Sequence, residues 1–469
     1  MERKNAWKMY SEEELTAVEK LSFQYRRFLN AGKTERECVA EAVRLAEKNG
    51  YQKLDRLIKN RQMVRPGDKI YISHMGKAAV FFQIGEQSLE HGMNIIGAHV
   101  DSPRLDIKQI PLYEETEQVY LDTHYYGGVK KYQWLAIPLA LHGVVIRKDG
   151  KQIEIRIGEN PEDPVFTITD LLPHLGKEQQ EQKVKEFIDA EKMDLLVGNQ
   201  SRKDKSAKEY VLQLLYEKYR IREEDFLSAE LEVVPAGEAR ECGIDRSMIM
   251  AYGQDDRSCA FASLTALFDL AQKGEHVKRT ACCLLTDKEE IGSAGATGMK
   301  SHFFENALAE LLNLEDADTY SLPLELRLRR ALMHSKMLSA DVSAAFDPMF
   351  EKYFEKKNTA YFANGLVFNK YSGSAGKAGA NDANAEYMAE LRNIMESQNV
   401  LFQTAELGAV DQGGGGTIAH IMAEYGMDVI DCGIAVLSMH APWEISCKAD
   451  LYEAVKGYRA FYGYTTVHE

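Results

Sequence analysis

The sequence predicts an α/β protein in which a mixed β-sheet carries helices on both faces and a smaller β-rich domain is inserted. From Gly243 onward, short apolar segments of strand length alternate with segments of helical periodicity. Between residues 107 and 235 this alternation is replaced by hairpin patterns and a long polar stretch. We therefore expect a main domain at residues 1–106 plus 243–469 and an inserted β-rich domain at 107–242.

Composition narrows the class of protein. The 469 residues include 57 Lys+Arg and 72 Asp+Glu, a net charge of −15 that disfavours nucleic acid as a partner. The seven cysteines form no C-x-x-C motif, and the N-terminus has no apolar signal core. The longest apolar run, at residues 134–146, is too short to cross a bilayer. We expect a cytoplasmic protein with reduced thiols and no membrane association.

Elements before residue 243 follow from periodicity and turn residues. Residues 11–49 have the apolar spacing of two helices, and residues 78–84 and 94–100 are apolar enough for strands. Within the insertion, residues 144–146 and 153–157 flank Lys148-Asp149-Gly150, which indicates a hairpin. The polar residues 176–208 predict an exposed loop or frayed helix, and residues 210–219 a short helix.

After Gly243 the predicted elements alternate between strands and helices. Strands are expected at residues 280–285, 337–342, 365–368 and 433–437. Helices are expected at residues 259–272, 383–396 and 417–424.

Four apolar strands end in side chains that can bind metals. The motifs at the ends of these strands are H-x-D, E-E-I-G-S, S-A-D and S-M-H. Open α/β sheets place their functional sites at the carboxyl ends of their strands. A fifth segment, G-Q-D-D-R, precedes the predicted helix at 259–272; its first Asp is either a helix N-cap or a carboxylate shared by two metals. The candidate side chains are His99, Asp101, Asp255, Glu289, Glu290, Asp341 and His440.

Imidazole and carboxylate donors without a nearby thiolate suit zinc, and also cobalt or manganese. Two ions are accommodated if Asp255 is shared, with His99 and Asp341 on one ion and Glu290 and His440 on the other. Glu289 is then left beside a ligand and becomes the candidate general base for a water activated by the metals. In H-x-D both side chains share one face of an extended segment, so Asp101 is expected to orient His99.

The ordered motifs H-x-D, D-D-R, E-E-I-G, S-A-D and M-H resemble those of the aspartyl aminopeptidase and vacuolar aminopeptidase I family. A-H-V-D-S-P-R, beginning at Ala98, is similar to that family's A-H-T-D-S-P motif, and E-L-G-A-V-D-Q-G-G-G-G-T, beginning at Glu406, is similar to its Gly-rich segment. The resemblance implies a zinc exopeptidase fold, two metal ions per subunit, and an inserted domain used for dimerisation. It also implies tetrahedral dodecamers built from dimers.

One segment departs from the family pattern. The family's eukaryotic aspartyl enzymes carry a His that reaches a neighbouring subunit's site, and Lys131 stands roughly where that His would be. Lys131 either takes over that contact or belongs to an ordinary solvated pair with Lys130. Lys370 and Lys377, near the expected substrate wall, are candidate contacts for an acidic side chain, alongside Lys131.

The predicted function is a metal-dependent aminopeptidase that hydrolyses the N-terminal residue of peptides. A related deacylase or carboxypeptidase on the same scaffold, and a catalytically idle oligomeric shell protein, are the alternatives. The chain contains no H-E-x-x-H or G-x-S-x-G, which disfavours zincin and serine-hydrolase chemistry.

Overall fold

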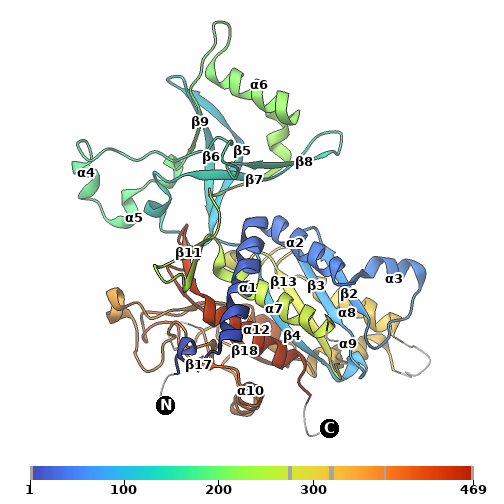
Figure 1. Cartoon of the computed structure of the whole chain (residues 1–469). Helices are drawn as coiled ribbons and strands as arrows, with labels where there is room; N and C mark the ends of the chain where they lie inside the picture. The colour runs from blue at the N-terminus through green and yellow to red at the C-terminus, as the bar shows by residue number, and fades with distance from the viewer. Residues whose placement is uncertain (1–3, 273–276, 316–321, 374–375, 466–469) are drawn as a thin grey trace. The chain divides into compact units, whose positions relative to one another are not determined.

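The computed structural model describes residues 4–272, 277–315, 322–373 and 376–465 (Figure 1). The chain divides into two compact units. The first comprises Met1–Asp101, Ala239–Met439 and Glu444–Glu469, and the second comprises Ser102–Glu238 and His440–Trp443. The use of the second unit for dimerisation stays a prediction.

Within the described residues, a nine-stranded sheet forms the centre of the first unit, in the order β1-β2-β3-β13-β4-β14-β18-β16-β17. In that order the strands are Gln52–Lys53, Lys69–His74, Ala78–Gln83, Thr280–Thr286, Met93–His99, Lys336–Ser339, Asp428–Gly433, Leu366–Asn369 and Phe402–Thr404. The three strands β13, β4 and β14 are parallel, with Thr286 beside His99 and Ser339 beside Gly97. Their carboxyl ends therefore meet at one edge of the sheet.

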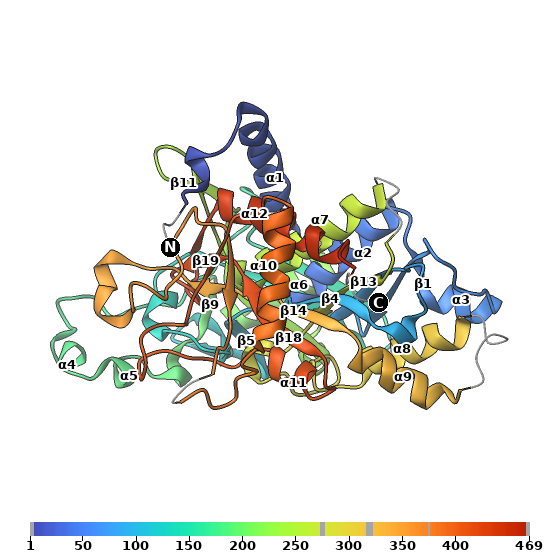
Figure 2. The same cartoon turned by 90° about the horizontal axis from the view of Figure 1, so that it is seen from below.

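Helices cover both faces of this sheet. They are α1 (Glu12–Ala31), α2 (Glu35–Lys48), α3 (Leu54–Asn60), α7 (Gln254–Gln272), α8 (Phe303–Leu314), α9 (Leu324–Met333), α10 (Ala385–Ser397), α11 (Ala419–Ala423) and α12 (Lys448–Tyr462). Helices α7 and α12 lie side by side (Figures 1 and 2). Helix α2 begins after Thr34, whose hydroxyl accepts a hydrogen bond from the N–H of Glu37 in a capping box.

The period-two alternation of strand residues separates two hydrophobic cores. Phe81 and Cys283 pack with residues of α1, α2, α7, α10 and α12 in one core. Their chain neighbours Phe82 and Cys282 pack with residues of α3, α8, α9 and α11 in the other. Continuous apolar runs are what a strand buried on both faces requires, and they explain why these strands could be predicted.

A second, smaller sheet of the first unit has the order β11-β12-β20-β19-β15. Its strands are Arg240–Cys242, Met248–Ala251, Glu444–Cys447, Ala435–Leu437 and Ser343–Ala344. The second unit is built on a sheet in the order β8-β7-β10-β5-β6-β9, with strands Gln152–Ile157, Leu139–Ile146, Ala229–Pro235, Arg104–Glu115, Gln118–Tyr126 and Leu195–Gly198. It also contains α4 (Lys177–Gln180), α5 (Val184–Phe187) and α6 (Ala207–Tyr219).

The predicted mixed α/β fold is confirmed, and most predicted elements are present within a few residues. The predicted hairpin is the antiparallel pair β7 and β8. The expectation of only loop or frayed helix at residues 176–208 was wrong, because β9 lies there and pairs with β6. Of the helices in the described ranges, none combines the length and the apolar composition of a membrane span.

Candidate active site

The candidate site of the first unit lies at the carboxyl edge of its large sheet. His99 is the last residue of β4, Glu289 and Glu290 follow β13 in a short 3₁₀ turn (Glu289–Ile291), and Asp341 follows β14. The ladder continues past the strand ends, because Val100 N–H donates to Thr286 O at 2.9 Å. Parallel pairing therefore brings together side chains that are far apart in sequence.

The donor atoms of His99, Asp255 and Asp341 lie within 4.8 Å of one another, and so do those of His99, Glu289 and Glu290. Asp255 lies at the start of α7, where the backbone is non-helical and the Asp255–Asp256 peptide bond is cis. Its Oδ1 is 3.2 Å from Nε2 of His99. His99 and Asp255 are buried, whereas Asp341, Glu289 and Glu290 are half-buried.

The electrostatics of this cluster favour a cation. Burial raises the pKa of Asp341 well above its usual range, and the charges of Asp255 and Asp256 raise it further. Burial alone lowers the pKa of His99, but hydrogen bonds to Asp101 and Asp255 outweigh this effect and raise it. Gathered carboxylates that repel one another are stabilised when a divalent ion is placed between them.

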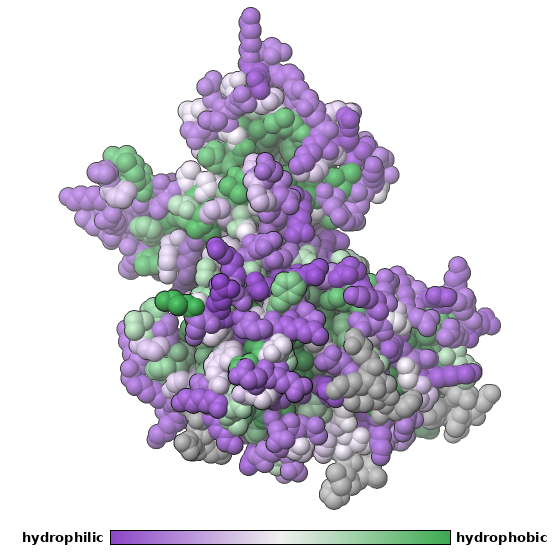
Figure 3. All heavy atoms as spheres, viewed as in Figure 1, coloured by the Kyte–Doolittle hydropathy of each residue, from purple (hydrophilic) through white to green (hydrophobic). Residues whose placement is uncertain are grey.

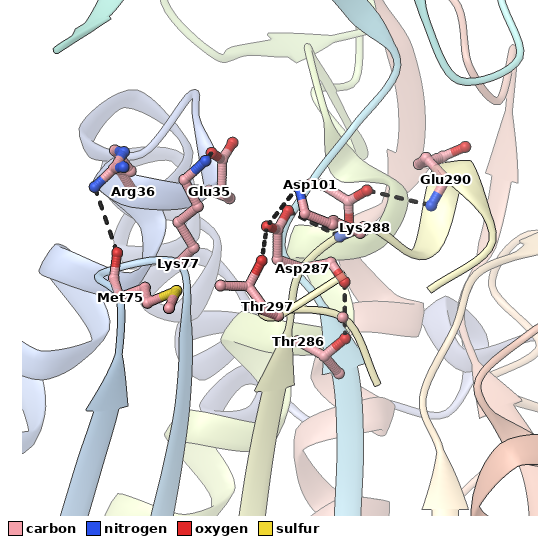
Figure 4. Close-up of polar contacts among 12 residues, drawn as sticks. Glu35, Arg36, Met75, Lys77, Asp101, Thr286, Asp287, Lys288, Glu290 and Thr297 are labelled. Carbon is pink, nitrogen blue, oxygen red and sulfur yellow. Dashed lines mark hydrogen bonds and ion pairs between the residues drawn. The ribbon is translucent and has the colours of Figure 1, made fainter. Parts of the chain in front are cut away.

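Asp101 contacts both His99 and the turn that carries Glu289 and Glu290. Its Oδ1 is 3.3 Å from Nδ1 of His99. Its two carboxylate oxygens accept the backbone N–H groups of Glu289 and Glu290, each at 3.2 Å. Figure 4 shows the contact with Glu290. The contact with His99 is the one that the H-x-D spacing predicts, whereas the contacts with the Glu289–Glu290 backbone were not foreseen.

Glu444 supports the site but was not among the residues predicted from the sequence. This buried residue of β20 accepts the backbone N–H groups of Gln254 at 2.6 Å and Asp255 at 3.1 Å. It therefore holds the chain at the entry to α7, where Asp255 lies. No motif surrounds Glu444 in the sequence, so only the pairing of β12 with β20 could have indicated it.

Asp287, directly before Lys288-Glu289-Glu290, is a second residue near the site that was not among the predicted site residues. It is 1% exposed, and burial together with the charges of Glu35 and Asp101 raises its pKa to about 6. Glu35 is itself buried and lies 3.4 Å from Nζ of Lys77 (Figure 4). A charged side chain immediately after a buried strand was the signal available in the sequence.

The remaining predicted site residues are placed as follows. His440 belongs to the second unit, where its Nδ1 is 3.0 Å from Gly128 O. Lys131, also in the second unit, donates to Ile188 O. Lys370 and Lys377 are exposed and both pair with Asp382. The roles of His440 as a ligand and of the three lysines as substrate contacts stay predictions.

Imidazole and carboxylate groups gathered at the carboxyl edge of an α/β sheet are the arrangement of a metal-dependent hydrolase. A model of the aminopeptidase I zinc metalloprotease (M18) family matches residues 28–462. A probable M18 family aminopeptidase 1 of Clostridium acetobutylicum is 52% identical over 465 residues, which cover 98% of each chain. The chain belongs to the M18 family of zinc metalloproteases, and it is an aminopeptidase.

Solved structures agree with this assignment. An M18 family aminopeptidase from Thermotoga maritima matches with a TM-score of 0.91 at 43% identity, covering 98% of this chain and 99% of that one. Aminopeptidase I from C. acetobutylicum matches with a TM-score of 0.88 at 51% identity, with the same coverage. The S. cerevisiae mApe1 dodecamer, at 21% identity and TM-score 0.76 over 95% of this chain and 97% of its own, is alike in fold alone. The family resemblance, the α/β fold and the aminopeptidase activity expected from the sequence are confirmed.

Proposed function

We propose that this aminopeptidase cleaves the N-terminal residue from short peptides with two divalent metal ions per subunit. Asp255 would serve both ions, His99 and Asp341 would hold one of them, and Glu290 and His440 would hold the other. The observation that carries the proposal is the grouping of His99, Asp255 and Asp341 donor atoms within 4.8 Å.

The residues fit the metals that the family implies. Nitrogen and oxygen donors without a thiolate suit zinc, with cobalt and manganese as alternatives. When bound, such ions polarise the scissile carbonyl and lower the pKa of the attacking water.

The protein's own groups position and move protons. Glu289 is the proposed general base, because its half-buried carboxylate lies beside Glu290 on a turn whose backbone is held by Asp101. Asp101 also lies against Nδ1 of His99, which directs Nε2 toward Asp255. Asp101 is thus proposed to orient one ligand and to hold the turn that carries the base.

Substitution of Glu289 tests its proposed role as the general base. We expect Glu289→Gln to lower kcat by about 10²- to 10⁴-fold, the usual contribution of general base catalysis, with two metal ions still bound per chain. Hydrolysis of aminoacyl p-nitroanilides and metal content by elemental analysis check this. Glu310→Gln, an exposed change on α8, is the matched control. A Glu289→Gln enzyme with near wild-type kcat would show that another group removes the proton.

An aminopeptidase, a deacylase and a carboxypeptidase differ in the substrates that they hydrolyse. An aminopeptidase requires a free α-amine, whereas a deacylase accepts an N-acylated substrate and a carboxypeptidase requires a free carboxylate. Paired assays on dipeptides and on their C-terminal amides, each with free and acetylated amines, distinguish them. Two bound metals without hydrolysis of any free-amine substrate would instead favour the idle shell protein.

Substrate contacts by Lys131, Lys370 and Lys377 are part of the proposal. Because Lys370 and Lys377 already pair with Asp382, an acidic substrate side chain would have to compete with that carboxylate.

The proposed assembly is a homo-oligomer, a tetrahedral dodecamer built from dimers, acting in the cytoplasm. Two observations support it. A chain of similar fold forms the mApe1 dodecamer. The second unit exposes several large apolar side chains, among them Ile110, Val165, Leu171, Leu172, Leu175 and Val184. Figure 3 shows hydrophobic areas on one face of this unit.

A further inference from the structure

A buried carboxylate closes the loop that follows β13. Oδ1 of Asp287 accepts the backbone N–H of Lys288 at 2.8 Å, and its Oδ2 accepts the hydroxyl of Thr297 at 2.5 Å (Figure 4). Both residues are buried, and the Asp287 N–H also donates to Thr297 O at 3.2 Å. Asp287 thus joins the strand end to the returning segment ten positions later by side chain and by backbone.

The turn inside this loop has a constrained backbone. Lys288 has φ +68°, and the Ser293 N–H donates to Lys288 O at 2.7 Å. At Gly298 a Cβ atom would lie 2.3 Å from Ser293 O, so the loop closes on itself too tightly for any other side chain there. The hydrogen bond from Lys288 to Asp287 therefore acts on a residue whose left-handed conformation sets the direction of Glu289 and Glu290.

The other end of the turn is held by Asp101, whose two oxygens accept the N–H groups of Glu289 and Glu290. Two buried carboxylates therefore hold one short turn. Asp101 comes from the β4 side, and Asp287 comes from the β13 side. Neither Asp287 nor Thr297 belongs to the groups of donor atoms that could hold a metal among the described residues.

We propose that Asp287 and Thr297 are positioning residues that fix the Glu289–Glu290 turn. The inference rests on the proposed function, because Glu289 and Glu290 matter here as base and ligand. Without the Thr297 hydroxyl, the Asp287 carboxylate loses one of its hydrogen bonds, and the left-handed conformation of Lys288 loses support. The base then samples positions away from the substrate, which lowers kcat more than it raises KM.

The test uses Thr297→Val, which removes the hydroxyl at nearly constant volume, and Thr297→Ser, which restores it. Thr280→Val is the matched control, since Thr280 is buried at the opposite end of β13 and its hydroxyl accepts the Gly85 N–H at 3.0 Å. Backbone hydrogen exchange of the segment 288–292 is measured in the zinc-loaded protein, together with kcat and KM.

We expect Thr297→Val to speed exchange of segment 288–292 and lower kcat by about tenfold each, the equivalent of one hydrogen bond, with KM within about twofold. Thr297→Ser should restore both quantities, and Thr280→Val should change neither. Unchanged exchange in Thr297→Val, or an equal loss of kcat in Thr280→Val, would overturn the inference.

Asp287→Asn provides a second test if Thr297→Val does not fold. It keeps an oxygen acceptor for Lys288 but removes the charge, and it should raise exchange in the same segment; wild-type exchange in this variant would overturn the inference. Different results would contradict the proposed role of Glu289 as the base and the proposed positioning role of Asp287 and Thr297. An active Glu289→Gln enzyme contradicts the base assignment, whereas wild-type exchange in Thr297→Val contradicts only the positioning role.

Discussion

Asp450 links two parts of the first unit through one buried carboxyl group. It lies in α12, and its oxygens accept the backbone N–H groups of Ala363 at 2.9 Å and Gly365 at 2.7 Å. Burial raises its pKa to about 7, although these two hydrogen bonds act in the opposite direction. In the folded protein this group therefore titrates near neutral pH, far above the range of an exposed aspartate.

This pKa predicts a pH-dependent contribution to stability. Between about pH 4 and pH 7 the folded chain holds a proton on Asp450 that the unfolded chain has released. The contribution of Asp450 to the free energy of unfolding therefore falls as pH rises through this window, by at most about 4 kcal/mol, and is constant above it. We expect the free energy of unfolding of wild type minus that of Asp450→Asn to fall from pH 5 to pH 8 in urea unfolding. Parallel stability profiles would contradict this.

Individual site residues could be predicted where they follow a recognisable strand. His99 and Asp101 end an apolar run, and Glu289 and Glu290 follow another, so local sequence placed them at one sheet edge. Thr297 could not be predicted, because its role comes from a loop that returns to Asp287. Such contacts depend on backbone path and carry no local signal.

Close approach between β18 and the segment after β14 limits one position to glycine. At Gly433, the last residue of β18, a Cβ atom would lie 1.9 Å from Asp341 O and 3.1 Å from Sγ of Cys259. Any side chain here must displace the backbone that carries the candidate ligand Asp341.

We expect Gly433→Ala to lower the free energy of unfolding by about 1–3 kcal/mol through overpacking, and to weaken zinc binding by moving Asp341. Calorimetry and zinc titration measure both effects. Gly416→Ala is the control, because no heavy atom lies within 4 Å of a Cβ atom there. Equal melting temperatures for the two variants would show that the neighbouring backbone gives way freely.

Elements were predicted best where both faces are buried. The apolar runs of β3, β4 and β13 stand out, whereas β18 was missed, since it contains two aspartates, one at its start and one among its apolar residues. One of them, Asp431, is buried and accepts hydroxyl hydrogen bonds from Ser372 at 2.9 Å and Thr417 at 2.7 Å. Aspartate is rare in strands, so tertiary hydrogen bonds overrode the local preference here.

The chain divides into two compact units, and in the proposed oligomer the second unit would form contacts between subunits. Apolar side chains on its surface, such as Leu172 and Leu175, are costly in a monomer and are stabilised when a second copy covers them. The composition of the chain alone gave no sign of this assembly.

We expect the wild-type protein to have about twelve times the mass of one chain in sedimentation experiments, and the double substitution of Leu172 and Leu175 by Glu to yield smaller species. The reason is that a buried charge without a partner destabilises an interface. Ile244→Glu, at a fully exposed position of the first unit, is the control. A monomeric wild type, or a double variant that assembles normally, would contradict the proposal.

The parallel register of β4, β13 and β14 has a consequence for biosynthesis. His99 and Asp341 come together only after the segments carrying them have entered the same sheet, and 241 residues, counted as 341 − 100, separate them along the chain. A nascent chain emerging from the ribosome therefore cannot offer the proposed cation this pair of donors until β14 has been synthesised. In the proposed site, His99 and Asp341 would therefore hold an ion together only after this part of the sheet has folded.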